Sequence, residues 1–161
     1  MNRSKIVLGL WPLAGVTTIG VTPEDAEQTI AAAIEGGITA FDTAYSYGFE
    51  GESDRLLGSF IGSNRERYRV MGKVGQRWSL DRQRVVDGSK QQLLKDAEES
   101  LRRMKLDYFD VLFLHAPDPN VALEESAAAM EQMRHQGWCR KIGICNITAE
   151  QLHAFSRHAQ V

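Results

Sequence analysis

The segment 108-YFDVLFLHAPDP-119 decides the fold of this chain. Four consecutive apolar residues, Val111 to Leu114, are followed by His115, and two prolines then end any regular element. A run that is apolar at every position has no solvent-facing side, so it predicts a strand of a parallel sheet covered on both faces. This strand finishes with the one side chain that ordinarily titrates near neutral pH, which raises the question of what His115 does there.

Five such apolar runs alternate with longer amphipathic segments. We expect strands at residues 5–11, 38–42, 68–74, 108–115 and 139–146. We expect helices at residues 22–34, 52–62, 89–104 and 123–136, and a last one from 148 almost to the C-terminus. Strands of this kind separated by helices indicate an α/β fold built from right-handed βαβ units.

Three of the expected helices begin with a polar residue followed three positions later by a side chain that can complete a cap. The pairs are Thr22 with Asp25, Ser89 with Gln92, and Thr148 with Gln151. Two architectures share the βα alternation, an open doubly wound sheet and a (β/α)₈ barrel. A nucleotide-binding open sheet usually carries a glycine-rich G-x-G-x-x-G or Walker turn, and neither spacing occurs here.

Composition places the chain among ordinary globular proteins. Its 161 residues are 43% hydrophobic and 25% charged with a net charge of −2, which indicates one domain and no nucleic-acid or membrane partner. Trp11 and Pro12 interrupt the segment where a signal-peptide core would continue, so we expect a cytoplasmic protein. Cys139 and Cys145 lack zinc-finger partners, and we expect both to be core thiols.

Each expected strand ends in a residue that could act on or hold a ligand. These residues are Trp11, Asp42, Lys73, His115 and Asn146. Any one of them has a simple structural explanation, such as a turn residue, a solvated cation or a hydrogen-bonded core histidine. Parallel strands bring their carboxyl ends to one face, and one shared site explains the set better than separate coincidences.

The segments around these residues resemble the aldo-keto reductases. "FDTAYSYG" (41–48), "MGKV" (71–74) and "LFLHAPDP" (112–119) are similar to that family's catalytic motifs. "GESDRLLG" (51–58) and "KIGICNIT" (141–148) are similar to two further family segments. The resemblance runs from Lys5 to Gln151 and implies a (β/α)₈ barrel, of which this chain supplies about five βα units. We therefore expect residues 1–161 to be the N-terminal part of a single barrel domain.

The resemblance also implies a catalytic tetrad of Asp42, Tyr47, Lys73 and His115 and the transfer of a hydride from NADPH to an aldehyde or ketone. The carbonyl oxygen becomes negative as the hydride arrives, so a proton donor must lie within hydrogen-bond reach. Tyr47 suits this role, with Lys73 stabilising the phenolate and Asp42 keeping the lysine charged. His115 orients the small-molecule carbonyl substrate in that family.

Further residues have implied roles around the tetrad. Asn146 and Cys145 correspond to the pair that holds the nicotinamide carboxamide, with Cys145 in place of the usual serine. Trp11, Tyr45 and Phe49 are candidates for the apolar wall of the substrate site. No metal is expected, because Asp42 and His115 lack an evident third ligand and Lys73 would repel a cation.

The family's later βα units supply much of the grip on the cofactor, and these have no counterpart in the 161 residues. We expect a piece of a longer enzyme, although self-association through open barrel edges would also cover the sheet. Two classes of function stay open. One is an NADPH-dependent carbonyl reductase, and the other is a non-catalytic half-barrel that acts as a binding or scaffold protein and keeps the tetrad as a relic.

Overall fold

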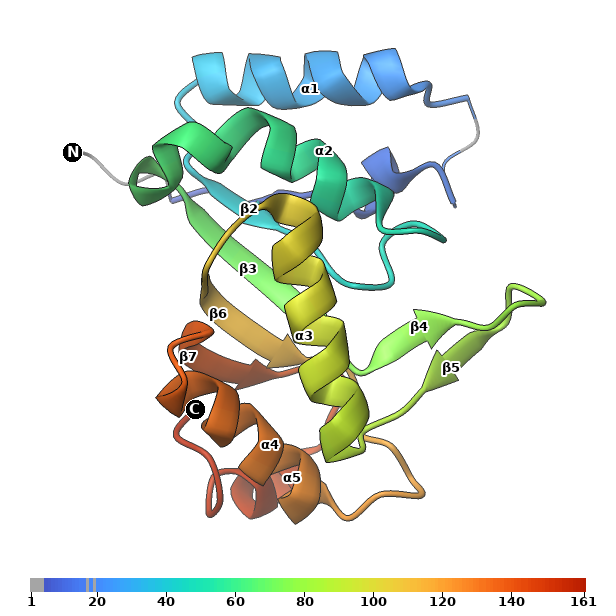
Figure 1. The fold of residues 1–161 in the computed structure, drawn as a ribbon, viewed down its shortest axis with the longest axis vertical. Coiled ribbons are helices and arrows are strands. Elements are labelled where there is room, and N and C mark those ends of the chain that lie inside the picture. Colours follow the sequence, from blue (N-terminus) through green and yellow to red (C-terminus); the bar gives the residue numbers. More distant parts are fainter. Residues whose placement is uncertain (1–4, 17, 19) are drawn as a thin grey trace.

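A five-stranded parallel sheet forms the centre of the protein, in a computed structural model that describes residues 5–16, 18 and 20–161. The strand order is β1-β2-β3-β6-β7. The strands are β1 (Leu8–Gly9), β2 (Ala40–Asp42), β3 (Arg69–Val74), β6 (Phe109–Leu114) and β7 (Cys139–Ile144). Neighbours in this order follow one another around the sheet as consecutive βα units, which is the arrangement of a barrel wall (Figure 1).

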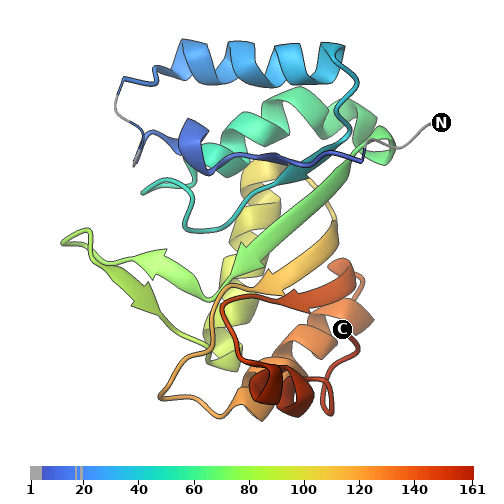
Figure 2. The same cartoon turned by 180° about the vertical axis from the view of Figure 1, so that it is seen from behind.

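Helices α1 to α4 lie on one face of the sheet, as the two opposite views show (Figures 1 and 2). The helices are α1 (Pro23–Glu35), α2 (Glu52–Ile61), α3 (Lys90–Met104), α4 (Leu123–His135) and α5 (Ala149–Phe155). Two 3₁₀ helices, η1 (Trp11–Ala14) and η2 (Gly62–Arg67), complete the set in the described residues. Among these residues, no helix combines the length and apolar character that a bilayer crossing requires.

The core lies between the helices and the sheet. Leu112 and Leu114 of β6 are fully buried against the helices, whereas Val111 and Phe113 on the opposite face are only partly buried. The expectation of a sheet covered on both faces is therefore wrong for the described residues, because helices cover only one side. In a closed barrel the second face becomes the interior.

Glycines let the layers approach closely at two points. A Cβ on Gly72 of β3 would collide with the ring of Phe109 on the neighbouring strand. A Cβ on Gly58 of α2 would lie 2.5 Å from the backbone oxygen of Met104, the last residue of α3. The backbone of α2 at Gly58 therefore lies close to the backbone at the end of α3.

The first expected strand is shorter than its apolar run. Only Leu8 and Gly9 pair with β2, and Trp11 begins η1 after a bend at Leu10. Trp11 is thus not the end of a strand, although it still follows the carboxyl end of β1. Pro12 explains the change, since it has no N–H to continue a ladder.

Two of the three expected caps are confirmed. Thr22 forms a capping box with Asp25, and Thr148 forms one with Gln151. Ser89 is the N-cap residue of α3, as expected, but the expected side-chain cap is wrong, since the Ser89 side chain makes no capping hydrogen bond. The N–H of Lys90 instead donates to the carboxylate of Glu125 at 3.1 Å, so a residue of α4 satisfies the start of α3. The last helix ends at Phe155, earlier than expected.

A β-hairpin that the sequence did not predict follows β3. Strands β4 (Gln76–Trp78) and β5 (Arg84–Val86) pair antiparallel and project from the edge where β3 ends (Figure 1). Gly75 makes the sharp turn into it, with a φ of +91° that a residue with a Cβ rarely adopts. The hairpin therefore lies at the same end of the sheet as the expected site.

Candidate active site

Four elements bring the predicted catalytic residues to one end of the sheet. Asp42 is the last residue of β2, Lys73 lies one residue before the end of β3, and His115 directly follows β6. Tyr47 lies in the loop between β2 and α2. The sequence prediction that these side chains share one face agrees with their positions, because all the strands of this sheet run parallel.

Lys73 is the centre of the group. Its ammonium donates hydrogen bonds to the carboxylate of Asp42 and, at 2.9 Å, to the phenol oxygen of Tyr47. A third, longer contact of 3.4 Å reaches the backbone oxygen of Thr43. The lysine is only 9% exposed, so a charge this deeply buried requires the acidic partner that Asp42 supplies.

Backbone hydrogen bonds hold the loop that carries Tyr47. The Tyr45 N–H donates to the backbone oxygen of Lys73 at 2.9 Å, and the Tyr47 N–H donates to that of Ala44 at 2.9 Å. The Tyr47 ring lies against Trp11, with 5.0 Å between ring centres, and meets the His115 ring edge-on at 6.0 Å. Tyr47 is thus placed by the strand beside it and by aromatic packing on two sides.

His115 is 8% exposed, and burial lowers its pKa to about 4, with the charges of Lys73 and Arg84 acting in the same direction. The imidazole is therefore neutral between pH 5 and 8. Its Nδ1 atom is buried without a hydrogen-bond partner in the described part of the protein. A buried polar atom of this kind is unusual and is expected to have a partner when a ligand is bound.

The residues after β7 lie beside this group. The side-chain amide of Asn146 donates to the backbone oxygen of His115 at 2.7 Å, and its backbone has a φ of +56°. Asparagine tolerates this left-handed conformation better than most residues. Cys145 is partly buried, and burial raises the pKa of its thiol, so the group stays protonated at neutral pH.

The three predicted wall residues separate in the structure. Trp11 contacts Tyr47, and Phe49 contacts Trp78 of the hairpin at 5.0 Å between ring centres. Tyr45 instead turns to α3, where its hydroxyl donates to Glu99 at 2.9 Å and its ring lies under Arg103. The structure therefore brings Trp11, but not Tyr45, to the tetrad.

Comparison with known proteins decides the family. The model of the aldo/keto reductase family matches residues 5–161. The chain belongs to this family. It is 34% identical over 157 residues to aldo-keto reductase YhdN of Bacillus subtilis strain 168, an alignment that covers 96% of this chain and 47% of that protein.

Solved aldo-keto reductase structures have the same fold. The glycerol dehydrogenase AKR11B4 from Gluconobacter oxydans superposes with a TM-score of 0.88 at 29% identity, covering all of this chain and 50% of that one. An aldo/keto reductase from Klebsiella pneumoniae, in complex with NADP and acetate, superposes with a TM-score of 0.76 at 28% identity over 98% of this chain and 50% of its own. The chain thus spans about half the length of the proteins it matches.

The site fits the nicotinamide end of the cofactor that such relatives contain. Asn146 offers an amide that can pair with a carboxamide, and it lies next to His115, whose Nδ1 is unpartnered. Cys145, where the family usually has serine, is a weaker hydrogen-bond partner. Asn146 and Cys145 are therefore candidates for holding the carboxamide.

The hairpin is the part of the aldo-keto reductase site that sequence reasoning missed. The indole N–H of Trp78 donates to the backbone oxygen of Ser46 at 2.9 Å, which ties the hairpin to the loop of Tyr47. The sequence signal for this hairpin is a pair of valines, Val85 and Val86, that follows a turn containing Asp81 and Arg82. That signal was weak, because arginines and glutamines dominate the segment.

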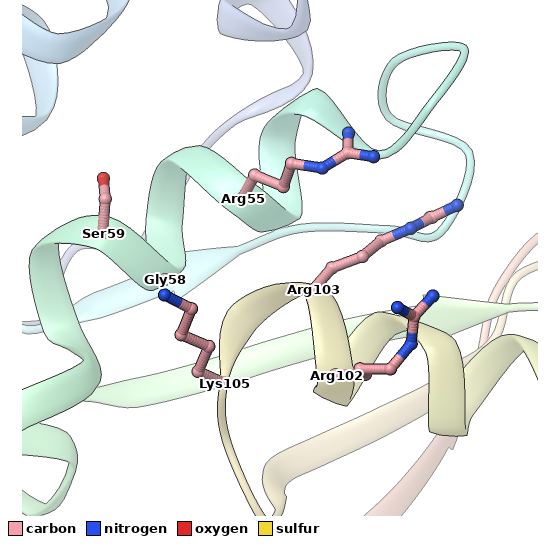
Figure 3. Close-up of a pocket in the computed structure, with 6 residues that line it drawn as sticks. All are labelled: Arg55, Gly58, Ser59, Arg102, Arg103 and Lys105. Carbon is pink, nitrogen blue, oxygen red and sulfur yellow. The ribbon is translucent and has the colours of Figure 1, made fainter.

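A cavity of about 380 Å³ lies away from the candidate site, between α2 and α3. Figure 3 shows Arg55 on α2 on the opposite side of the groove from the cations at the end of α3 and from Lys105 just beyond it. Arg103 is already bound to Glu99 at 3.0 Å, and cations at a helix C-terminus complement the helix dipole. The cavity contains no tetrad residue, and its charges have this structural explanation.

Proposed function

We propose that the protein carrying this chain reduces the carbonyl group of an aldehyde or ketone with NADPH, and that Tyr47 is the general acid. One observation carries the proposal: the Lys73 ammonium contacts both the Asp42 carboxylate and the Tyr47 phenol oxygen, at the end of the sheet where barrel enzymes have their sites. Membership of the aldo-keto reductase family and the NADP bound to a similar structure support it.

Proton delivery follows from this geometry. NADPH supplies a hydride to the carbonyl carbon, and the carbonyl oxygen then carries negative charge. Tyr47 donates its proton to that oxygen, and the phenolate left behind lies 2.9 Å from the Lys73 ammonium. A unit charge about 4 Å away is worth about 4 kcal/mol at an effective dielectric constant of about 20, so the lysine favours the transfer strongly. The Asp42 carboxylate contacts the same ammonium and compensates its buried positive charge.

His115 positions the substrate in this scheme. Its pKa of about 4 makes the imidazole neutral, so one ring nitrogen donates a hydrogen bond and the other accepts one. The donor holds the carbonyl oxygen next to the Tyr47 phenol. Asn146 and Cys145 hold the nicotinamide carboxamide, and Trp11 and Phe49 form the apolar wall. We do not extend the wall to Tyr45, because its hydroxyl is bound to Glu99.

Two measurements test the proposal. Titration with NADPH should quench the tryptophan emission saturably, because Trp11 lies 5.0 Å from the Tyr47 ring. Addition of an aldehyde such as 4-nitrobenzaldehyde should then consume NADPH. If the protein neither binds NADPH nor consumes it, the proposed reduction is wrong and the non-catalytic scaffold with a relic tetrad becomes the better explanation.

We also propose that residues 1–161 form the N-terminal part of one barrel domain. In the described part of the chain, β1 and β7 each pair on one side only, so two edges of the sheet are unpaired. Such edges favour pairing with another chain. A polypeptide of residues 1–161 produced alone should therefore self-associate, and light scattering should give at least twice the mass of one chain. A monodisperse monomer would contradict this proposal.

A further inference from the structure

Arg84 lies on the hairpin beside the candidate site, against Trp11. It is the first residue of β5, opposite Trp78 across the hairpin. Its guanidinium carbon lies 4.8 Å from the centre of the Trp78 ring and 5.0 Å from the centre of the Trp11 ring. The side chain is therefore held between two indoles that belong to different segments of the chain, and it remains exposed to solvent.

This cation has no acidic partner among the described residues. Arg77 on the same hairpin lies 3.5 Å from Asp96 and 3.8 Å from Asp87, and Arg103 lies 3.0 Å from Glu99. No ion pair of this kind involves Arg84 within residues 5–16, 18 and 20–161. An arginine contacts an indole through the face of its guanidinium. The N–H donors point outward in the plane of the guanidinium and stay free to bind another group. The N–H edge of Arg84 is therefore available to a carboxylate.

The position is also close to the reacting groups. The Trp11 ring contacts both groups, because its centre lies 5.0 Å from the Arg84 guanidinium carbon and 5.0 Å from the centre of the Tyr47 ring. The sum of these two distances is the upper limit for the distance from the guanidinium carbon to the Tyr47 ring centre. The hydrogen bond from Trp78 to Ser46 fixes the hairpin against the Tyr47 loop. Arg84 also helps to lower the pKa of His115, so its charge reaches the site.

We propose that Arg84 is an anion subsite of the carbonyl site and that the substrates are aldehydes or ketones that carry a carboxylate a few bonds from the carbonyl. This inference rests on the proposed function of the tetrad. A carboxylate suits the subsite because one planar guanidinium matches both the single charge and the two oxygens of that group. Because the Trp11 and Trp78 rings already hold the Arg84 side chain, less conformational entropy is lost when its guanidinium binds a carboxylate.

A pair of matched compounds tests the subsite. 4-Carboxybenzaldehyde carries the anion, and its methyl ester has the same carbonyl without the charge. With NADPH, we expect a kcat/KM for the carboxylate compound about 10- to 100-fold above that of the ester, chiefly through a lower KM. Arg84→Gln should remove this preference, whereas Arg84→Lys, which keeps the charge without the fork, should retain part of it.

Arg82→Gln is the matched control. Arg82 lies on the same hairpin but stacks on Phe49, with 4.5 Å between the guanidinium carbon and the ring centre, so this change should keep the preference for the carboxylate. An equal kcat/KM for the two compounds in the unaltered protein would overturn the proposal. A loss of activity with both compounds to the same degree in Arg84→Gln would also overturn it, because Arg84 would then only support the aromatic packing.

Calorimetric titration separates this proposal from the proposed function. If the protein binds 4-carboxybenzaldehyde more tightly than the ester, and Arg84→Gln abolishes the difference, the subsite is supported even if no NADPH is consumed. If Arg84→Gln weakens NADPH binding and leaves carboxylate binding unchanged, Arg84 contacts the cofactor phosphates and the subsite is refuted.

Discussion

Two carboxylates from the same stretch of sequence, Asp42 and Asp54, meet different surroundings. Asp42 ends β2, retains 25% exposure of its side chain and contacts the Lys73 ammonium. Asp54 is on α2 and fully buried, and it accepts hydrogen bonds from Thr43 at 2.8 Å and Ser100 at 2.5 Å. Its nearest cation, Arg103, is 3.9 Å away.

The comparison distinguishes a carboxylate of the candidate active site, Asp42, from a carboxylate that stabilises the fold, Asp54. The Lys73 ammonium, in direct contact, compensates the charge of Asp42. Asp54 has mainly hydroxyl donors, and burial raises its pKa from 3.8 to about 6. It joins β2, α2 and α3 through neutral groups, so its role is structural. The two carboxylates are nevertheless linked, because Thr43, which donates a hydrogen bond to Asp54, directly follows Asp42 in the chain.

The largest effect should come from removing the Tyr47 hydroxyl. Tyr47→Phe should lower kcat for carbonyl reduction by about 10²- to 10⁴-fold, because no other phenol reaches the Lys73 ammonium in the described residues. Steady-state NADPH consumption measures this. Tyr45→Phe is the matched control in the same loop, and it should change kcat little, since that hydroxyl is bound to Glu99. Equal losses of kcat in both variants would contradict the assignment of Tyr47 to the active site and of Tyr45 to the packing of the fold.

Asp54→Asn should change the pH dependence of stability. Between pH 4 and 6 folded Asp54 holds a proton that the unfolded chain has released, so its contribution to stability falls as the pH rises through this range. Asparagine cannot ionise. The free energy of unfolding of the variant, relative to the unaltered protein, should therefore rise by up to about 3 kcal/mol from pH 4 to pH 7.5.

Urea unfolding at several pH values measures this difference. The opposite contribution of His115 is present in both proteins and cancels. Asp107→Asn, at an exposed position, is the control and should show no such trend. A difference between the variant and the unaltered protein that does not vary with pH would show that Asp54 is not the buried, titrating group described above.

The smallest effect should come from Cys145→Ser. A serine hydroxyl is a stronger hydrogen-bond partner than a thiol, so the dissociation constant for NADPH should fall about 2- to 10-fold. Fluorescence titration measures it. Cys139→Ser is the control: this cysteine is 3% exposed in the core, so the change should lower stability by about 1–3 kcal/mol and leave NADPH binding unaltered. Weaker NADPH binding in Cys145→Ser would remove Cys145 from the carboxamide site.

Some features were predictable because they depend on neighbours in the chain. The strand ends at Asp42 and His115 follow from short apolar runs, and the Thr22 and Thr148 caps depend on residues three positions apart. Ser89 stands at the N-cap of α3 without a side-chain hydrogen bond, and the N–H of Lys90 is bound by Glu125 of another helix, a contact that no local pattern shows. The β4–β5 hairpin was missed because its segment is polar and its position depends on Ser46 and Trp11.

The sequence by itself determined the βα alternation and the chemistry at the strand ends, since parallel strands must bring their carboxyl ends to one face. Only the tertiary structure decided that Tyr47 reaches Lys73 while Tyr45 turns to Glu99, and that Arg84 lies between two indoles. The physical reason is that side-chain direction depends on packing between segments far apart in the chain. Local periodicity carries no information about such contacts.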